Sequence, residues 1–333
     1  MFEFEVKDLS INKISALLTY GVSPRPIALV STISQDGVNN LSPFSFFNAF
    51  GSNPPVVAFS PSRRVRDGSL KDTYHNLIES KECVIHAVSY AMVEQVNLAS
   101  CDYPPEVDEF IKSGFTPIES DLVKPRRVME SPFQMECKLI QMVNCGDEFG
   151  AGNIAICEVL KFHISEKVYR DGKIDPALLD LVGRNGAEYY THANKSSLFT
   201  VMKPGTKKGM GFDNLPDFIK DSSIYTANNL GKMALLEKLP TQEELDDFIK
   251  TIESLNELEF VEATEANFVR FSDTRDYRQM FAIAYVLHLK NNPKVGKYIE
   301  LAAKAAIDVN DFDFGIKAAV WRGKFIESRR IGN

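Results

Sequence analysis

Three consecutive residues, Lys71, Asp72 and Thr73, have types and spacing that suit the binding of an anion. They come directly before an apolar-periodic stretch that contains Leu77 and Ile78. We expect a helix to begin at Asp72, so that Lys71 and Thr73 lie where free backbone N–H groups and the helix dipole attract negative charge. A capped helix with solvated surface charges fits the same spacing, so the segment alone leaves both interpretations open.

Two neighbouring segments would extend such a site. Arg63 and Arg64 precede the expected helix and would supply further cations. Residues 45–49, Ser-Phe-Phe-Asn-Ala, place aromatic side chains among small ones, and such a run is most often part of a core. On composition alone, a binding role and a packing role both stay open for this run.

Other kinds of site find no support in the sequence. The five histidines and five cysteines have no metal-ligand spacing, and there is no C-x-x-C pair. No G-x-G-x-x-G follows a strand, so a Rossmann dinucleotide site is not indicated. We also find no nucleophile–base triad or carboxylate pair, and therefore assign no catalytic residue and no metal.

The elements that must position these residues are mainly strands. Residues 26–33 read as a buried strand, and the turn signal Asp36-Gly37 predicts a hairpin with a strand over 41–47. Another strand opens at Pro54-Pro55. Apolar and polar residues alternate over 133–139, and the apolar positions then shift by one residue at Ile140, which indicates a bulge. A final strand, 154–164, has Phe162 on one face and His163 on the other.

Close turns without regular βαβ alternation favour a β-barrel over a doubly wound sheet. The glycine- and lysine-rich segment 203–211 reads as a linker, and helical periodicity follows it. Thr241 with Glu244 forms a capping box there, and Asn292-Pro293 precedes another helix. We therefore predict two domains, a β-barrel over 1–202 and a small all-α domain over 203–333.

Bulk composition excludes several classes of function. The chain has 333 residues, 44% of them hydrophobic, and a net charge of -7, which argues against general affinity for nucleic acid. No apolar segment is long enough to span a bilayer, so we expect no membrane association. The first residues lack the pattern of a signal peptide, and the scattered cysteines fit a reducing compartment, so we expect a cytoplasmic protein.

Five segments, taken in order, resemble a known family: residues 25–32, 42–49, 54–55, 71–73 and 184–190. Together they are similar to the flavin reductase and flavoredoxin family of FMN-binding split barrels, over about residues 10–195. Residues 107–110, 132–138 and 174–176 also fit that pattern. The resemblance implies a Greek-key split barrel that binds FMN, mostly as a homodimer, and leaves the role of 205–333 open.

The resemblance also implies which residues hold the cofactor. These are Arg25, Ser45, Phe47, Asn48, Ala49, Arg63, Arg64, Lys71, Thr73, Ser100 and Arg184. Lys71 and Thr73 are expected to bind the phosphate, and the run 45–49 is expected to pass along the ring and ribityl chain. His163 is expected to contact nicotinamide, because a histidine on this strand is associated with that role in the family.

The implied activity is hydride transfer from NAD(P)H to FMN. Hydride passes directly to flavin N5, so the lack of a triad is neutral evidence. The alternative is a flavoredoxin-like FMN electron carrier without dinucleotide turnover. The helical segment 205–333 would cover the site or dock a redox partner or oxygenase component. A haem-binding split barrel is a more distant alternative, since no histidine or cysteine is placed as an axial ligand.

Overall fold

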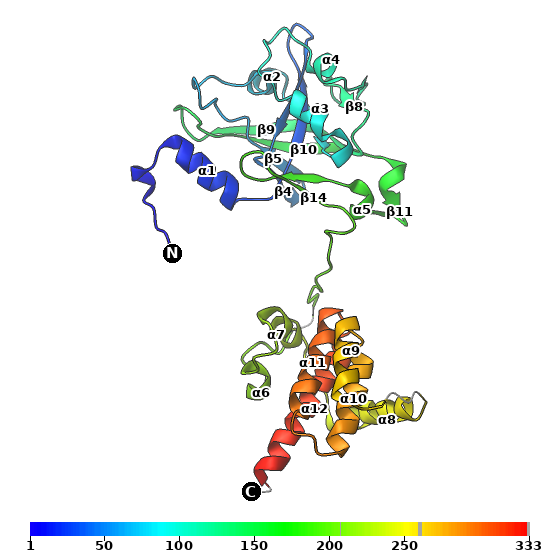
Figure 1. Cartoon of the computed structure of the whole chain (residues 1–333). Coiled ribbons are helices and arrows are strands. Elements are labelled where there is room, and N and C mark those ends of the chain that lie inside the picture. The colour runs from blue at the N-terminus through cyan, green and yellow to red at the C-terminus, as the bar shows by residue number, and fades with distance from the viewer. Residues whose placement is uncertain (207, 259–261, 332–333) are drawn as a thin grey trace. The chain divides into compact units, whose positions relative to one another are not determined.

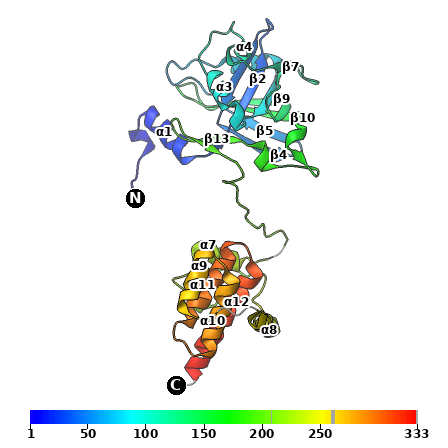
Figure 2. The ribbon, with the colours of Figure 1, turned by 45° about the vertical axis from the view of Figure 1, so that its right-hand side comes forward.

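The computed structural model describes residues 1–206, 208–258 and 262–331. The chain divides into two compact units, Met1–Thr200 and Val201–Asn333. The first consists mainly of strands and the second of helices, as Figures 1 and 2 show. The predicted order of a β domain followed by an all-α region is therefore confirmed.

The first unit is built on one antiparallel sheet with the strand order β3-β2-β6-β9-β10-β5-β4. Its strands are β2 (Ala28–Ile33), β3 (Asn39–Phe44), β4 (Phe47–Ser52), β5 (Pro55–Phe59), β6 (Glu82–Ala87), β9 (Phe133–Asn144) and β10 (Asn153–Ile164). The predicted hairpin at Asp36-Gly37 joins β2 to β3, with Ile33 opposite Asn39. The strand predicted at Pro54-Pro55 is β5.

Short elements surround this sheet. The helices are η1 (Val6–Asp8), α1 (Ile11–Gly21), α2 (Asp72–Ser80), η2 (Tyr90–Met92), α3 (Val93–Leu98), α4 (Glu109–Ser113), η3 (Glu166–Val168) and α5 (Pro176–Leu179). The small strands are β1 (Arg25–Pro26), β7 (Pro117–Ile118), β8 (Arg127–Val128), β11 (Tyr169–Arg170), β12 (Lys173–Ile174), β13 (Val182–Arg184) and β14 (Tyr190–His192). In both ribbon views α1 lies at the margin of this unit (Figures 1 and 2).

Alternation along β2 separates two cores. Ala28 and Val30 pack inside the curved sheet with side chains of β5, β6, β9 and β10. Ile27 and Leu29 face the other way and pack against α3 and α4. Because successive side chains of a strand point to opposite faces, the apolar residues at the start of β2 and the residue before it supply both cores.

Two bulges interrupt the ladder between β9 and β10. Ile140 is the extra residue on β9, which confirms the predicted parity shift. Leu160 is an extra residue on β10, because Val159 lies opposite Cys137 while Lys161 lies opposite Glu136. This second bulge is absent from the alternation predicted over 154–164, and it reverses the facing of the residues that follow.

The second unit is a helical bundle. Its helices are α6 (Asp217–Lys220), α7 (Ala227–Ala234), α8 (Gln242–Leu258), α9 (Glu265–Thr274), α10 (Tyr277–Leu289), α11 (Val295–Asp308) and α12 (Phe312–Ile331). The predicted capping box is present, since Thr241 and Glu244 exchange hydrogen bonds at the start of α8. Phe281 and Ile299 lie at the centre of the core. Among the helices of the described residues, none has the length and apolar composition needed to cross a membrane.

Candidate functional site

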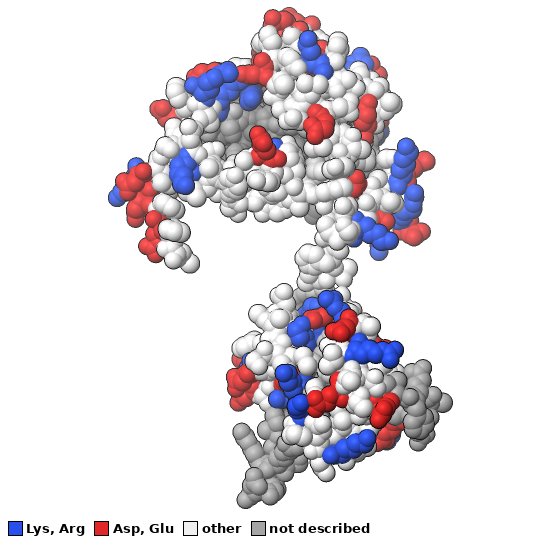
Figure 3. Space-filling model, viewed as in Figure 1, with Lys and Arg blue, Asp and Glu red and all other residues white. Residues whose placement is uncertain are grey.

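A small polar cleft lies at the start of α2. It brings together four residues predicted to bind the cofactor, Arg64, Lys71, Thr73 and Ser100. The other residues around it are Asn40, Ser42, Asp72, Ala99, Cys101, Asp102, Tyr103 and Glu109. Figure 3 shows basic side chains gathered beside a hollow in this unit. Residues from three separate stretches of the sequence thus meet around one group of cations.

The backbone at the start of α2 is arranged to receive an anion. Lys71 has extended backbone angles and precedes the first helical residue, Asp72, as predicted. The first N–H groups of a helix have no partner within the helix, so those of Asp72 and Thr73 are available to a ligand. Lys71 is half-buried, and burial together with the nearby Arg64 charge lowers the pKa of its ammonium. The negative charge of a bound anion would offset both effects, because it favours the charged ammonium.

Arg64 is held in place by its neighbours. Its Nη1 donates to the Leu70 carbonyl at 2.6 Å and to Ser69 Oγ at 3.2 Å. Its Nε and Nη2 face the Asp102 carboxylate, with Nη2 2.8 Å from an oxygen. The Arg64 guanidinium, followed by Arg66, keeps the pKa of Asp102 below its usual range. A carboxylate of this chain therefore occupies the side of Arg64 that an external anion would use.

Thr73 belongs to a buried polar network behind the cleft. Its hydroxyl donates to Asn40 Oδ1 at 2.8 Å, so this proton is already used within the protein. Asn40 Nδ2 in turn donates to Glu109 Oε1 at 3.3 Å, and the Leu41 N–H donates to Glu109 Oε2 at 3.1 Å. Burial raises the pKa of the Glu109 carboxyl to about 7. Thr73 thus offers the cleft its backbone N–H, while its side chain anchors the helix start.

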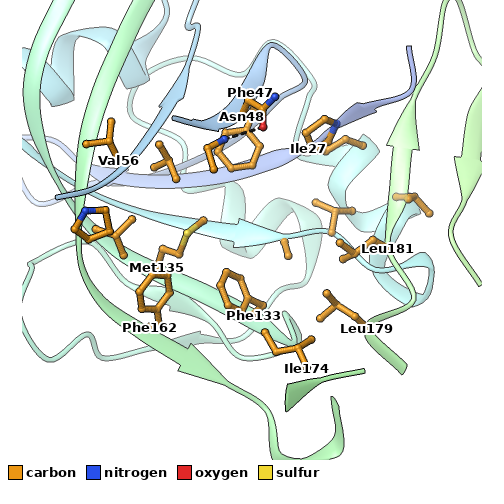
Figure 4. Close-up of a pocket in the computed structure, with 18 of the residues that line it drawn as sticks. Ile27, Phe47, Asn48, Val56, Phe133, Met135, Phe162, Ile174, Leu179 and Leu181 are labelled. Atoms are coloured by element: carbon orange, nitrogen blue, oxygen red, sulfur yellow. Dashed lines mark hydrogen bonds between the residues drawn. The ribbon is translucent and has the colours of Figure 1, made fainter. Parts of the chain in front are cut away.

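A second, apolar pocket of about 400 Å³ lies along β4 and β10. Phe47, Asn48 and Ala49, all predicted site residues, line it. Figure 4 shows Phe47 and Asn48 on one side of the pocket, with Phe133 and Phe162 on the other. Among its lining residues, all in the described part of the chain, Asn48 alone has a polar side chain. Such a slot suits a flat ring system whose edge needs few polar partners.

The structure places Arg25 and Ser45 elsewhere. Arg25 is 5% exposed and donates to the carbonyls of Thr19, Val22 and Asn185, while its Nε is 3.4 Å from Ser45 Oγ. A buried guanidinium needs such acceptors, and carbonyls at the C-terminal end of α1 supply them. Arg25 therefore joins α1 to the loop after β13 and does not line either pocket.

Arg63 and Arg184 are also separate from the cleft. Arg63 donates to the Gly68 carbonyl at 3.0 Å and pairs with exposed Asp147 at 3.2 Å. Arg184 lies over the Tyr190 ring, 4.5 Å from its centroid, in a third pocket that Glu188 and His192 also line. The predicted cofactor residues thus divide among several places within one chain.

His163 faces away from the apolar pocket. The bulge at Leu160 turns Phe162 toward the pocket with its partner Met135, so His163 lies on the opposite face. There its Nε2 is 2.6 Å from Glu136 Oε1, and Glu136 is fully buried. The structure does not bring His163 together with the other predicted residues.

Asp102 and Glu109 are among the cleft residues that were not predicted from the sequence. They lie 22 and 29 residues beyond the end of α2 at Ser80 and reach the cleft only through the tertiary fold. Glu109 does follow the helix-capping Asp108, whose carboxylate accepts from the Phe110 N–H at 2.8 Å. That capping signal was readable, but it indicates a helix start and not a position beside Thr73.

Comparisons with known proteins place residues 20–184 in one family, since they match the model of the "Flavin reductase like domain". An uncharacterized protein of Aquifex aeolicus is 37% identical over 57% of this chain and 95% of its own length. The uncharacterized protein YwrF of Bacillus subtilis is 32% identical over 61% of this chain and all of its own length.

Solved structures agree with this family. Nitrilotriacetate monooxygenase component B from Bacillus cereus is 30% identical, with a TM-score of 0.57 over 60% of this chain and 98% of its own. The Pseudomonas fluorescens 2-nitrobenzoate 2-nitroreductase NbaA is 25% identical, with a TM-score of 0.54 over 60% of this chain and 96% of its own. A putative flavin reductase with a split barrel domain from Shewanella frigidimarina, 21% identical with a TM-score of 0.51, shares the fold.

Proposed function

The chain belongs to the flavin reductase-like family, and we propose that its N-terminal unit binds FMN and transfers hydride to it from NAD(P)H. One observation carries the proposal: Arg64, Lys71, Thr73 and Ser100 surround a single cleft at a helix start. Cationic side chains and free N–H groups together are the donor set that a phosphate dianion requires.

The two pockets suit the two ends of FMN. The polar cleft would hold the phosphate through Lys71, Arg64 and the first N–H groups of α2. The apolar pocket would hold the ring against Phe47 and Asn48. Ser42, which lines the cleft, and Phe47 are joined by at most about 17 Å of extended chain, so the two pockets are close neighbours in the fold.

Bound FMN would supply the redox chemistry, accepting hydride at N5. The chain's own residues then have to bind, orient and exclude water. The nearly unbroken apolar lining of the pocket keeps water from the ring faces, and Asn48 provides an amide for the ring edge. No nucleophile or general base is needed, which fits the composition of this pocket.

A homodimer is part of the proposal. Helix α1 has no buried residue, and Leu17 and Leu18 on it are exposed apolar side chains. Phe46, just before β4, and Phe50, within it, are also exposed. Apolar surface of this extent is typical of a surface that another chain covers, and a second copy is the partner that we propose. Light scattering at several protein concentrations tests this part.

We propose further that the reduced flavin serves an oxygenase component. The related Bacillus cereus structure is named as component B of a monooxygenase, and this chain resembles it over nearly that protein's whole length. The test is whether the purified protein, with NADH and FMN, supports a separate flavin-dependent oxygenase across a dialysis membrane. Failure there, with normal FMN reduction, would restrict the proposal to flavin reduction.

A direct experiment tests the central proposal. Purified protein is titrated with FMN by fluorescence quenching, and oxidation of NADH and of NADPH is then followed with excess FMN. We expect saturable FMN binding and dinucleotide oxidation well above the buffer rate. Binding without turnover would support an electron carrier, and no binding of FMN would refute the proposal.

A further inference from the structure

Glu109, the first residue of α4, is buried against the polar cleft. It is 6% exposed and lines the cleft with Lys71 and Thr73. Its two oxygens accept hydrogen bonds from Asn40 Nδ2 and from the Leu41 N–H, both on β3. A carboxyl group beside an anion-binding helix start is unexpected, because its negative charge would repel the anion.

Charged and titratable groups from several elements surround Glu109. Lys71, Asp72 and the start of α2 lie on one side, and Arg64 and Asp102 line the same cleft. Tyr103 lies on the loop before α4, and desolvation, followed by the neighbouring Cys101 and then the Glu109 charge, raises the pKa of that phenol. Asp108, the preceding residue, is engaged by Asn39 Nδ2 at 2.8 Å. Strand β3 contributes Asn40, the Leu41 N–H and Ser42, which are neutral.

We propose that Glu109 is a positioning residue that takes up a proton when a phosphate monoester enters the polar cleft, so that binding of the phosphate is coupled to protonation. This inference rests on the proposed function, because the phosphate monoester that we expect is that of FMN. It assigns to Glu109 a role in setting the charge of the cleft, with no contact to the reacting ring.

The energetics favour such coupling near neutrality. Burial, together with the nearby Asp72 charge, raises the pKa of Glu109 to about 7. Its proton is therefore easily gained or lost under ordinary conditions. A phosphate dianion in the cleft adds negative charge to that of Asp72 and shifts the equilibrium further toward the protonated carboxyl. The cations Lys71 and Arg64 act in the opposite sense, but the phosphate neutralises them when it binds.

The contacts also connect Glu109 to the helix start. The Asn40 amide donates to Glu109 and accepts from the Thr73 hydroxyl, so one side chain touches both. Asn40 Oδ1 accepts from Thr32 as well, and Asn76 donates to Thr32. A change of charge on Glu109 therefore acts on the amide that fixes Thr73, the second residue of α2.

The decisive measurement is the pH dependence of FMN affinity between about pH 6 and pH 9. The proteins compared are the wild type, Glu109→Gln and the control Glu106→Gln, which removes an exposed carboxylate from the same loop. Riboflavin, which lacks the phosphate, serves as the second ligand. Gln keeps an acceptor for the Leu41 N–H and mimics the neutral carboxyl.

For the wild type we expect FMN affinity to fall as the pH rises above about 7, approaching tenfold per unit for one coupled proton. We expect Glu109→Gln to lose this dependence, Glu106→Gln to retain it, and riboflavin affinity to be flat in all three proteins. An undiminished dependence in Glu109→Gln, or the same dependence for riboflavin, overturns the inference and leaves FMN binding standing. Absence of FMN binding at every pH refutes the proposed function itself.

Calorimetry of the wild-type protein gives a second test that needs no variant. Titration of FMN near pH 7 in two buffers with different ionisation enthalpies measures the protons taken up on binding. We expect a net uptake of about half a proton near the pKa of Glu109. The second pKa of the FMN phosphate is about 6, so the phosphate itself can exchange protons near pH 7. The calorimetric titration is therefore repeated at higher pH, where the phosphate is a dianion. Zero uptake at both would overturn the inference.

Discussion

Asp102 and Arg64 form an ion pair of 2.8 Å at the edge of the polar cleft, and the second Asp102 oxygen accepts from Arg66 at 2.9 Å. The guanidinium that a phosphate would use is thus paired within the chain. We expect Asp102→Asn to raise FMN affinity by roughly twofold to fivefold, because an exposed ion pair of about 1 kcal/mol no longer competes. Asp147→Asn, which breaks the exposed ion pair with Arg63 outside the cleft, is the control. A loss of affinity in Asp102→Asn would mean that Asp102 is needed to orient Arg64.

Lys71 is expected to recognise the phosphate and not the ring. Lys71→Met should weaken FMN binding by about tenfold to a hundredfold, since a charge-assisted contact is worth roughly 1.5–3 kcal/mol. Riboflavin binding should stay within about twofold of the wild type. The control is Lys81→Met, which removes an exposed cation after the other end of α2. Equal losses for FMN and riboflavin would place Lys71 at the ring instead.

Asn48 is expected to show the opposite pattern. As the polar side chain of the apolar pocket, it should contact the ring edge, so Asn48→Ala should weaken FMN and riboflavin alike. Loss of one hydrogen bond predicts roughly a twofold to tenfold change. Gln35→Ala, in an exposed turn, is the matched control. A change confined to FMN would contradict the assignment of this pocket to the ring.

His163 tests the prediction that a histidine of β10 contacts nicotinamide. Because the histidine binds buried Glu136 on the other face, His163→Gln should leave the KM for dinucleotide unchanged. It should lower the free energy of unfolding by about 1–3 kcal/mol, the cost of weakening a hydrogen bond to a buried carboxylate. Phe162→Ala should instead raise the KM, since Phe162 lines the pocket. A raised KM with unchanged stability in His163→Gln would support the nicotinamide contact.

His86 predicts how acid destabilises the fold. Its Nδ1 lies 2.8 Å from the Leu29 carbonyl, and its Nε2 accepts from the Val128 N–H, which fixes the neutral ring. Burial lowers its pKa from 6.5 to about 4. The unfolded state therefore binds more protons in this window, and stability is lost as the pH falls from 6.5 toward 4, by about 3 kcal/mol at most.

Urea unfolding at several pH values measures this effect. Relative to the wild type, His86→Gln should be less stable at neutral pH but should lose less stability on acidification. The difference between the two proteins isolates His86 from other titrating groups, including Glu109, whose raised pKa acts in the opposite direction. Parallel pH profiles would show that His86 does not contribute.

Local signals in the sequence predicted the parts of the site that are local in structure. The helix start at Asp72 and the hairpin at Asp36-Gly37 depend on neighbouring residues, and both are confirmed. The buried position of Arg25 depends on Asn185, which lies 160 residues later, so no short pattern reveals it. Asp102 and Glu109 likewise reach the cleft through tertiary packing.

The sequence predicted only in part which face of the sheet each side chain of β10 lies on. On β9 the alternation of apolar and polar residues shifts by one position at Ile140, and this shift predicted the bulge. On β10 apolar residues stand at even positions both before Leu160, at Ile156, and after it, at Phe162, and this pattern hides the shift between Val159 and Lys161. The fold class follows from strand patterning, whereas the face that each side chain presents depends on pairing with the neighbouring strand.

Leu160 has a consequence for the evolution of the site. In a chain lacking that one residue, Lys161 would follow Val159 directly and still lie opposite Glu136, so Phe162 would stay opposite Met135 and in the pocket. A single-codon deletion at this position would thereby remove the bulge and leave the wall of the pocket as it is.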